Sequence, residues 1–321
     1  MNEHAGSGTP GHRSPLVVRA AAVESGVTDW TLRTGVRTGD LDRLYRGMYS
    51  PRQNMFVTED GRVVGPDSIE ARRDHYRRRV MAAAEFGEER KAASHHSAAA
   101  LHKIPVLGLP DDIHFTADRH SGGRREGRAF FLHASPLPPD EVTIVDGILT
   151  TTLARTAMDV ARSGSFTEAL VVLDAALRAG ATLDELTLLT DRGRRRRGIA
   201  LVRRAMTLAD GRSESAGESL SRALMIRAGI PAPDLQVEYR DDDGEVFARV
   251  DFDWGGRVVG EFDGLVKYGD AADVVAEKRR EDKLRALGII VVRWTWDDLR
   301  NPDRFTATLR RAFITAGVLA A

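Results

Sequence analysis

Four carboxylates stand at alternate positions on two neighbouring segments late in the 321-residue chain. Asp251 and Asp253 belong to the first segment, and Glu261 and Asp263 to the second. Residues two apart share a face of a β-strand, and like charges opposed across strands cost up to about 1 kcal/mol per pair. A divalent cation would offset that repulsion, so the spacing favours a Mg²⁺ or Mn²⁺ site suited to phosphodiester hydrolysis. The alternative is an exposed acidic face paired with arginines.

The connection between the two segments decides whether the acids meet. A two-residue turn at Gly255-Gly256 would place Asp251 opposite Gly260 and mix apolar with acidic side chains. A three-residue loop, 255–257, with a glycine in the left-handed region pairs Asp251 with Glu261 instead. This register also pairs Phe252 with Gly260 and Trp254 with Val258. We therefore expect all four acids on one face of the sheet. The apolar face is then expected to carry Ala248, Val250, Phe252, Trp254, Val258 and Phe262.

The segments flanking the acids predict an αβββαβ order. A helix from about Glu214 to Ala228 is ended by Gly229 and Pro231. The predicted strands are Leu235–Arg240, Glu245–Trp254, Arg257–Asp263 and the apolar Ile289–Trp294. The remaining predicted helices are Ala272–Leu287, before the last strand, and a final one from about Asp297.

This order resembles the PD-(D/E)XK nuclease superfamily, with Asp251 on the second strand and Glu261-Phe262-Asp263-Gly264 on the third. More narrowly it is similar to the DUF559 branch, related to the very-short-patch-repair endonucleases, over roughly residues 213–316. The motifs that carry this likeness are Gly260–Gly264, Lys267-Tyr268, Glu277–Asp282 and Leu287–Trp294.

The resemblance implies a restriction-endonuclease-like core that binds Mg²⁺ or Mn²⁺ through Asp251 and Glu261. Glu218 would be an additional acid, although the helix dipole alone favours an acid near a helix start. Asp263 stands where the superfamily has a lysine that supports the attacking water. Lys267 is the substitute from the following loop, or a phosphate contact. The implied function is a metal-dependent DNA endonuclease.

The alternative function is a non-catalytic DNA-binding regulator, antitoxin-like, whose nuclease fold has become a binding platform. The departure at Asp263 favours it, and so does the start of the chain. Residues 15–50 predict two short helices joined by a tight turn, with Thr28 as the second N-cap, and then a strand-like run. Leu44–Tyr49 is similar to the winged-helix segment of AbiEi-type antitoxins, which implies a toxin or defence-system partner.

The whole chain is expected to be a multidomain α+β protein. Residues 1–14 predict a disordered tail, 15–50 a winged helix-turn-helix, 51–150 an AbiEi-like α+β domain, 151–212 a helical connector and 213–321 the nuclease-like domain. Within the middle region we expect helices at 69–86, 92–101, 152–162, 166–179 and 183–189.

Charge is balanced overall, with 47 basic and 47 acidic residues, but arginines gather locally. Five lie between Arg72 and Arg79 and seven between Arg192 and Arg204. These runs fit either phosphate-binding patches or solvated helix faces. The residues expected to contact DNA are Arg33, Arg37, Arg46, Arg194, Arg195 and Arg279.

The chain has no cysteine, which excludes disulfides, thiolate metal sites and cysteine nucleophiles. No apolar run approaches the roughly 18 residues of a membrane span, and the first 15 residues lack the apolar core of a signal peptide. We therefore expect a cytoplasmic protein without a membrane partner.

Overall fold

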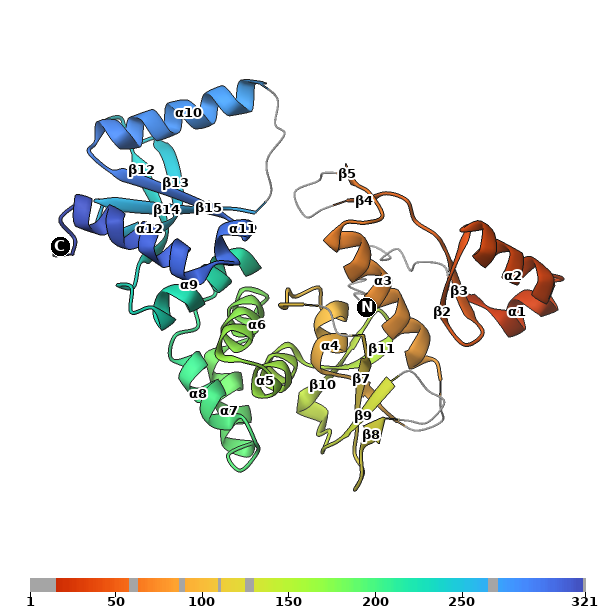
Figure 1. The fold of residues 1–321 in the computed structure, drawn as a ribbon. Coiled ribbons are helices and arrows are strands. Elements are labelled where there is room, and N and C mark those ends of the chain that lie inside the picture. Colours follow the sequence, from red (N-terminus) through yellow and green to blue (C-terminus); the bar gives the residue numbers. More distant parts are fainter. Residues whose placement is uncertain are drawn as a thin grey trace, which may run out of the picture. The chain divides into compact units, whose positions relative to one another are not determined.

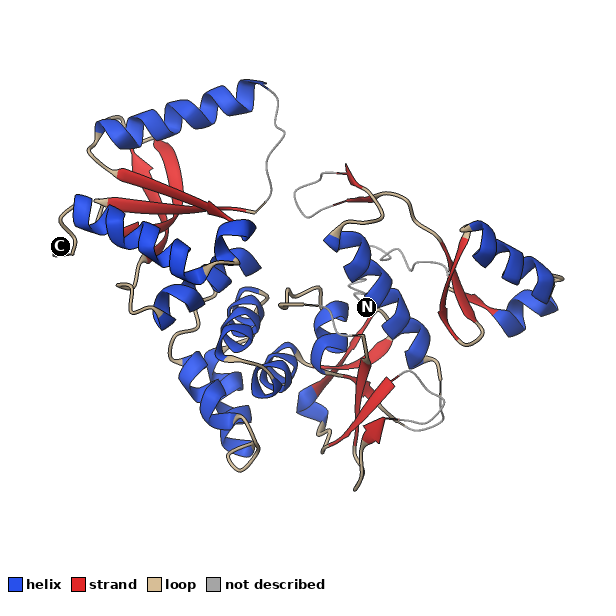
Figure 2. Cartoon of the chain, in the orientation of Figure 1, coloured by secondary structure: helices blue, strands red, loops and turns tan. Residues whose placement is uncertain are grey.

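A computed structural model describes residues 16–57, 63–86, 90–108, 111–124, 130–264 and 271–319. The predicted tail and Lys267 lie outside the described residues. The chain divides into two compact units, Met1–Lys103 with Gly108–Thr156 and Ile104–Leu107 with Ala157–Ala321. Both units mix helices and strands, so the fold is α+β (Figure 2). None of the helices in the described ranges is long and apolar enough to cross a membrane.

The first unit begins with two short helices and a small sheet. Helix α1 (Arg19–Glu24) and helix α2 (Asp29–Thr38) precede strands β2 (Leu41–Tyr45) and β3 (Met48–Pro51), and β1 (Val17–Val18) pairs with β3. The sheet is antiparallel, in the order β1-β3-β2. Thr28 caps α2 as expected, because its hydroxyl accepts the Thr31 amide at 3.1 Å.

The rest of the first unit surrounds helix α3 (Ile69–Ala84) and a six-stranded sheet. The sheet order is β10-β11-β6-β7-β9-β8, and a two-stranded ribbon of β4 (Phe56–Val57) and β5 (Val63–Val64) precedes α3. The strands of the sheet are β6 (Ala92–Ala93), β7 (Ile113–Ala117), β8 (Gly123–Arg124), β9 (Phe130–Ala134), β10 (Val142–Val145) and β11 (Ile148–Thr151).

The helix predicted at 92–101 is wrong in its first residues. Ala92 and Ala93 pair with β7 instead, and the Ser94 amide donates to the His114 carbonyl at 3.0 Å. Helix α4 begins only at His95 and runs His95–Leu101. Alanine favours helices, so here pairing with the neighbouring strand overrode the local preference.

The second unit opens with a group of helices that leads into the C-terminal sheet. The first four helices are α5 (Leu153–Ser163), α6 (Phe166–Arg178), α7 (Leu183–Arg192) and α8 (Ile199–Met206). Helix α9 (Ala216–Arg227) packs on α6, and the fully buried Asp174 of α6 pairs with Arg222 of α9 at 2.5 Å. This buried ion pair fixes α9 against the helical region.

The C-terminal sheet has four strands in the order β12-β13-β14-β15. Its strands are β12 (Asp234–Arg240), β13 (Val246–Trp254), β14 (Val258–Asp263) and β15 (Ile290–Thr295), with β14 and β15 parallel. Helix α10 (Ala271–Ala286) covers one face, and α9, α11 (Trp296–Leu299) and α12 (Pro302–Thr315) cover the other (Figure 1). The predicted final helix is therefore two helices, separated before Pro302.

The predicted register of the β13–β14 hairpin is confirmed for two of its three pairs: Phe252 pairs with Gly260 and Trp254 with Val258, across the three-residue loop 255–257. The backbone pairing of these strands ends before the third pair, Asp251 with Glu261. Gly255 and Gly256 have φ values of +64° and +66°, in the region that favours glycine.

The prediction that the apolar residues of β13 share one face is wrong. Phe252 and Trp254 pack with Trp294 on the α9 and α12 side, whereas Val250 packs with Leu284 of α10. Strand β12 changes sides at the same level, because Leu235 lies in the first cluster and Val237 borders the second. Between them Gln236 has φ +57°, which interrupts the regular alternation of an extended strand.

Two glycines allow aromatic rings to pack directly against the backbone of α9 and β14. A Cβ on Gly217 of α9 would lie 2.0 Å from the Phe262 ring, and one on Gly260 would lie 2.4 Å from the Trp294 indole. The absence of both side chains therefore sets how closely α9 and β15 approach β14.

We predict that Gly217→Ala lowers the free energy of unfolding of the second unit by about 1–3 kcal/mol, because the added methyl overpacks a buried contact. Urea unfolding followed by tryptophan fluorescence would measure the loss. Gly65→Ala, where nothing lies within 4 Å of the added Cβ, is the control. The double variant Gly217→Ala/Phe262→Leu should recover part of the stability; no recovery would contradict the assigned clash.

Candidate active site

The site lies where β13 and β14 separate. The backbone pairing of the two strands ends at Phe252 and Gly260. Beyond that point the Asp251 carboxylate, rather than a backbone carbonyl, accepts a hydrogen bond from β14. Asp251 Oδ2 accepts the Phe262 amide at 2.8 Å. The side chain therefore lies between the strands, and burial raises the pKa of Asp251, while this hydrogen bond opposes the rise.

Glu218 reaches the same place from the start of α9 and is only 7% exposed. Its Oε1 accepts the Ser215 hydroxyl at 2.7 Å, and its Oε2 accepts the Glu214 amide at 2.8 Å. Burial, followed by the nearby negative charge of Asp251, raises the pKa of Glu218 to about 6. Glu218 thus closes the helix N-terminus and also adds a second carboxylate beside Asp251.

Gln236 joins these two acids and was missed by the sequence analysis. Its Nε2 donates to Glu218 Oε2 at 2.9 Å and to Asp251 Oδ1 at 3.3 Å. It stands on β12 between two residues that pair with Val250 and Phe252, which places it opposite Asp251. The predicted turn at 241–244 would have placed Gln236 opposite Arg249, and the register shift between Tyr239 and Arg240 brings it opposite Asp251 instead.

Glu261, 5% exposed, is the third acid and is already paired with arginines. Nη2 of Arg280, from α10, lies 2.9 and 3.0 Å from its two carboxylate oxygens. Nη2 of Arg293, from β15, lies 2.8 Å from Glu261 Oε2. Arg293 also pairs with Glu277 of α10, so the two arginines connect Glu261 to both neighbouring elements. The arginine pairing considered from sequence applies to this carboxylate, although it is buried rather than exposed.

Of the other two predicted acids, Asp253 has a separate role, whereas Asp263 borders this group. Asp253 accepts the Tyr239 hydroxyl at 2.9 Å and the Gly256 amide at 3.0 Å, so it closes the hairpin loop. The prediction of a single four-acid cluster is therefore wrong for Asp253. Asp263, at the lysine position of the resembled motif, is half-buried and lies 3.8 Å from Arg293.

The donor set fits a hard cation only in part. Asp251 and Glu218 offer buried carboxylate oxygens side by side, and Mg²⁺ is commonly held by one or two carboxylates with water and phosphate completing its shell. Glu261 does not fit as it stands, because guanidinium groups occupy both of its oxygens. Within the described ranges no three histidine or acidic side chains are grouped so that they could hold a metal.

The arginines expected to contact DNA are all exposed. Arg33 and Arg37 lie on α2, and Arg46 lies in the turn between β2 and β3. Arg194 and Arg195 lie in the connection between α7 and α8, and Arg279 lies on α10. The first three belong to one unit and the others to the second.

The first unit contains a separate histidine cluster. His114 Nδ1 lies 3.0 Å from His133 Nε2, and the His133 ring stacks on that of His95 at 3.8 Å. Burial, followed by the neighbouring His133 and His96, lowers the pKa of His114 to about 4. His114 is thus neutral near neutral pH.

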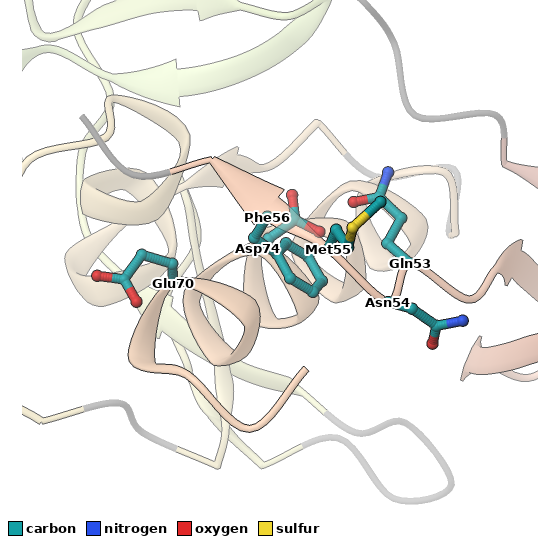
Figure 3. Close-up of a pocket in the computed structure, with 6 residues that line it drawn as sticks. All are labelled: Gln53, Asn54, Met55, Phe56, Glu70 and Asp74. Carbon is teal, nitrogen blue, oxygen red and sulfur yellow. The ribbon is translucent and has the colours of Figure 1, made fainter. Parts of the chain in front are cut away.

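A shallow pocket in the first unit offers no better candidate (Figure 3). Gln53, Asn54, Met55 and Phe56 line it together with Glu70 and Asp74 of α3. The Asp74 carboxylate already accepts Arg78 Nε at 2.7 Å, so its charge serves an internal ion pair.

Comparisons with known proteins leave the function open. No protein-family model matches the chain. Uncharacterized protein Rv2248 of Mycobacterium tuberculosis strain H37Rv and uncharacterized protein MT2308 of strain CDC 1551 are each 39% identical over 170 residues, which is 52% of this chain and 62% of theirs. The match thus spans less than two thirds of the length of these relatives. A crystal structure of the RV2827C protein from Mycobacterium tuberculosis is similar over 69% of this chain and 78% of that one, with 14% identity and a TM-score of 0.34.

We predict that Arg293→Met lowers the free energy of unfolding of the second unit by about 2–4 kcal/mol, because it removes a cation from a buried carboxylate. Chemical denaturation of the purified variant would measure it. Arg300→Met is the matched control, since the Arg300–Asp297 pair is 80% and 83% exposed and is expected to contribute under about 0.5 kcal/mol. Equal losses in the two variants would contradict the assigned network.

We predict that the first unit loses stability as pH falls from about 6.5 toward about 4, because the unfolded chain protonates His114 more readily than the folded one. His114→Gln should reduce this loss of unfolding free energy by on the order of 1–2 kcal/mol between pH 6.5 and 4. Urea unfolding at several pH values would show it. Exposed His120→Gln is the control; an unchanged slope in His114→Gln would refute the assignment.

Proposed function

We propose that the chain is a metal-dependent nuclease that hydrolyses phosphodiester bonds of DNA, of the PD-(D/E)XK type and similar to the DUF559 branch. The observation that supports this most is the buried pair of Asp251 and Glu218, joined by Gln236 at the point where β13 and β14 separate. The αβββαβ order of α9 to β15 agrees with the resemblance to that superfamily.

Each group has a definite role in this proposal. Asp251 and Glu218 hold Mg²⁺ or Mn²⁺, and the Gln236 amide keeps their carboxylates turned toward each other. When bound, the ion supplies a Lewis acid and lowers the pKa of a coordinated water. Asp263 cannot supply the positive charge of the lysine that the resembled motif has, so a cation from elsewhere in the chain is required to contact the phosphate.

DNA binding in this proposal uses the first helices of the chain as well. The two helices and three-stranded sheet of residues 17–51 have the composition of a winged helix-turn-helix, and Arg33 and Arg37 lie exposed on its second helix. Such residues position a protein on the duplex through phosphates rather than through bases.

A second candidate function is a DNA-binding regulator without cleavage, antitoxin-like and with a toxin or defence-system partner. The observation that favours it is the pairing of Glu261 with both Arg280 and Arg293. An arginine-neutralised acid would suit a binding platform that needs no metal.

We predict that the purified protein nicks supercoiled plasmid in the presence of Mg²⁺ or Mn²⁺ and that Asp251→Asn reduces the rate by at least about 100-fold, because the ion loses a ligand. Gel electrophoresis of the plasmid measures the rate. Asp242→Asn, in the exposed turn between β12 and β13, carries the same change and should cleave normally. Cleavage that survives Asp251→Asn rejects this site. DNA binding without cleavage or metal uptake in the unmodified protein selects the regulator instead.

A further inference from the structure

Arg280 makes an incomplete pair with Glu261. One nitrogen, Nη2, serves both carboxylate oxygens, at 2.9 and 3.0 Å. Its Nε is buried and has no hydrogen-bond partner among the described residues. Its Nη1 reaches the Arg249 carbonyl only at 3.5 Å, the outer limit of a hydrogen bond.

This arrangement leaves the guanidinium with N–H donors that make no strong hydrogen bond. Arginine pairs most strongly with an anion when two of its nitrogens each meet one oxygen in parallel. In Arg280 that fork is unused. The side chain is 31% exposed but its Nε is buried, so an anion can engage the fork only if the guanidinium moves toward solvent. A phosphodiester group carries one negative charge on two oxygens, which is the arrangement that the fork binds.

Glu261 does not depend on Arg280 alone. Arg293 contacts Glu261 Oε2 at 2.8 Å and is fixed in turn by Glu277. If Arg280 moves away, the buried carboxylate keeps one cation and gains a free oxygen at Oε1, whose hydrogen bond within the described part of the chain comes from Arg280.

We propose that Arg280 is a phosphate-binding residue of the site, and that a DNA phosphate and the Glu261 carboxylate compete for its guanidinium. A bound phosphate draws Arg280 from Glu261, and the freed carboxylate oxygen becomes a ligand for the cation beside Asp251. This inference rests on the proposed nuclease function. It assigns Arg280 the cationic role that Asp263 cannot fill, and it makes DNA and metal bind cooperatively, since each favours the same displaced state.

Two binding measurements without catalysis test the proposal. Free Mn²⁺ is counted by electron paramagnetic resonance during titration of the DNA-free protein, and binding of a short fluorescent duplex is followed by anisotropy in EDTA. Arg280→Gln is expected to tighten Mn²⁺ binding about tenfold and to weaken DNA binding. It should also reduce the slope of log affinity against log salt by about 0.9, the value for one phosphate contact.

Lys278→Gln is the control for the Mn²⁺ measurement, because it removes the same charge from an exposed position on α10. It should leave Mn²⁺ affinity unchanged. Arg280→Met serves as a second variant, and circular dichroism confirms that each variant is folded.

The outcomes separate this inference from the function it rests on. Tighter Mn²⁺ binding with weaker DNA binding in Arg280→Gln supports the competition. Unchanged or weaker Mn²⁺ binding there, with binding lost in Asp251→Asn, overturns the competition and leaves the nuclease proposal intact. Unchanged DNA affinity and salt slope overturn the phosphate role. No Mn²⁺ binding by the unmodified protein or by Arg280→Gln overturns both proposals.

Discussion

The cost of burying negative charge governs the second unit. Three carboxylates meet where β13 and β14 separate, and a carboxylate removed from water is tolerated only when donors or cations replace the lost solvent. Each acid meets this condition differently: Asp251 through the Phe262 amide, Glu218 through donors at the start of α9, and Glu261 through two arginines. Within the described residues no cation pairs with Asp251 or Glu218, so these two acids would gain most from a metal ion.

The separation of the strands depends on backbone features that carry no charge. The three-residue loop 255–257 sets the register, and the left-handed Gln236 on β12 lies where the apolar residues change sides. Gly217 and Gly260 then allow α9 and β15 to approach β14 closely. A Cβ added at either glycine would overlap an aromatic ring, that of Phe262 or that of Trp294. Packing therefore holds Asp251 close enough to Glu218 and to Glu261 that, after burial, its negative charge also raises the pKa of both.

The contact between Arg280 and Glu261 connects the two candidate functions. As a permanent ion pair it neutralises the third acid and leaves a surface suited to binding. As an exchangeable pair it holds a phosphate-binding cation and a metal ligand together until substrate separates them. Arg280 is the more exchangeable of the two arginines, because Arg293 is also held by its ion pair with Glu277. The same geometry explains how a site with Asp263 in place of a lysine could still contact a phosphate.

The sequence by itself determined the order of the elements from α9 to β15 and the pairing of Phe252 with Gly260. Both follow from local rules: side-chain periodicity, helix caps and a loop length that left one consistent register. Only the tertiary structure decided that Val250 and Phe252 lie on opposite faces, that Asp253 closes a loop, and that arginines contact Glu261. Arg280 and Arg293 lie 19 and 32 residues from Glu261, and Gln236 lies 15 residues from Asp251. Contacts over such separations depend on how whole elements pack, which the spacing of residues along one strand does not encode.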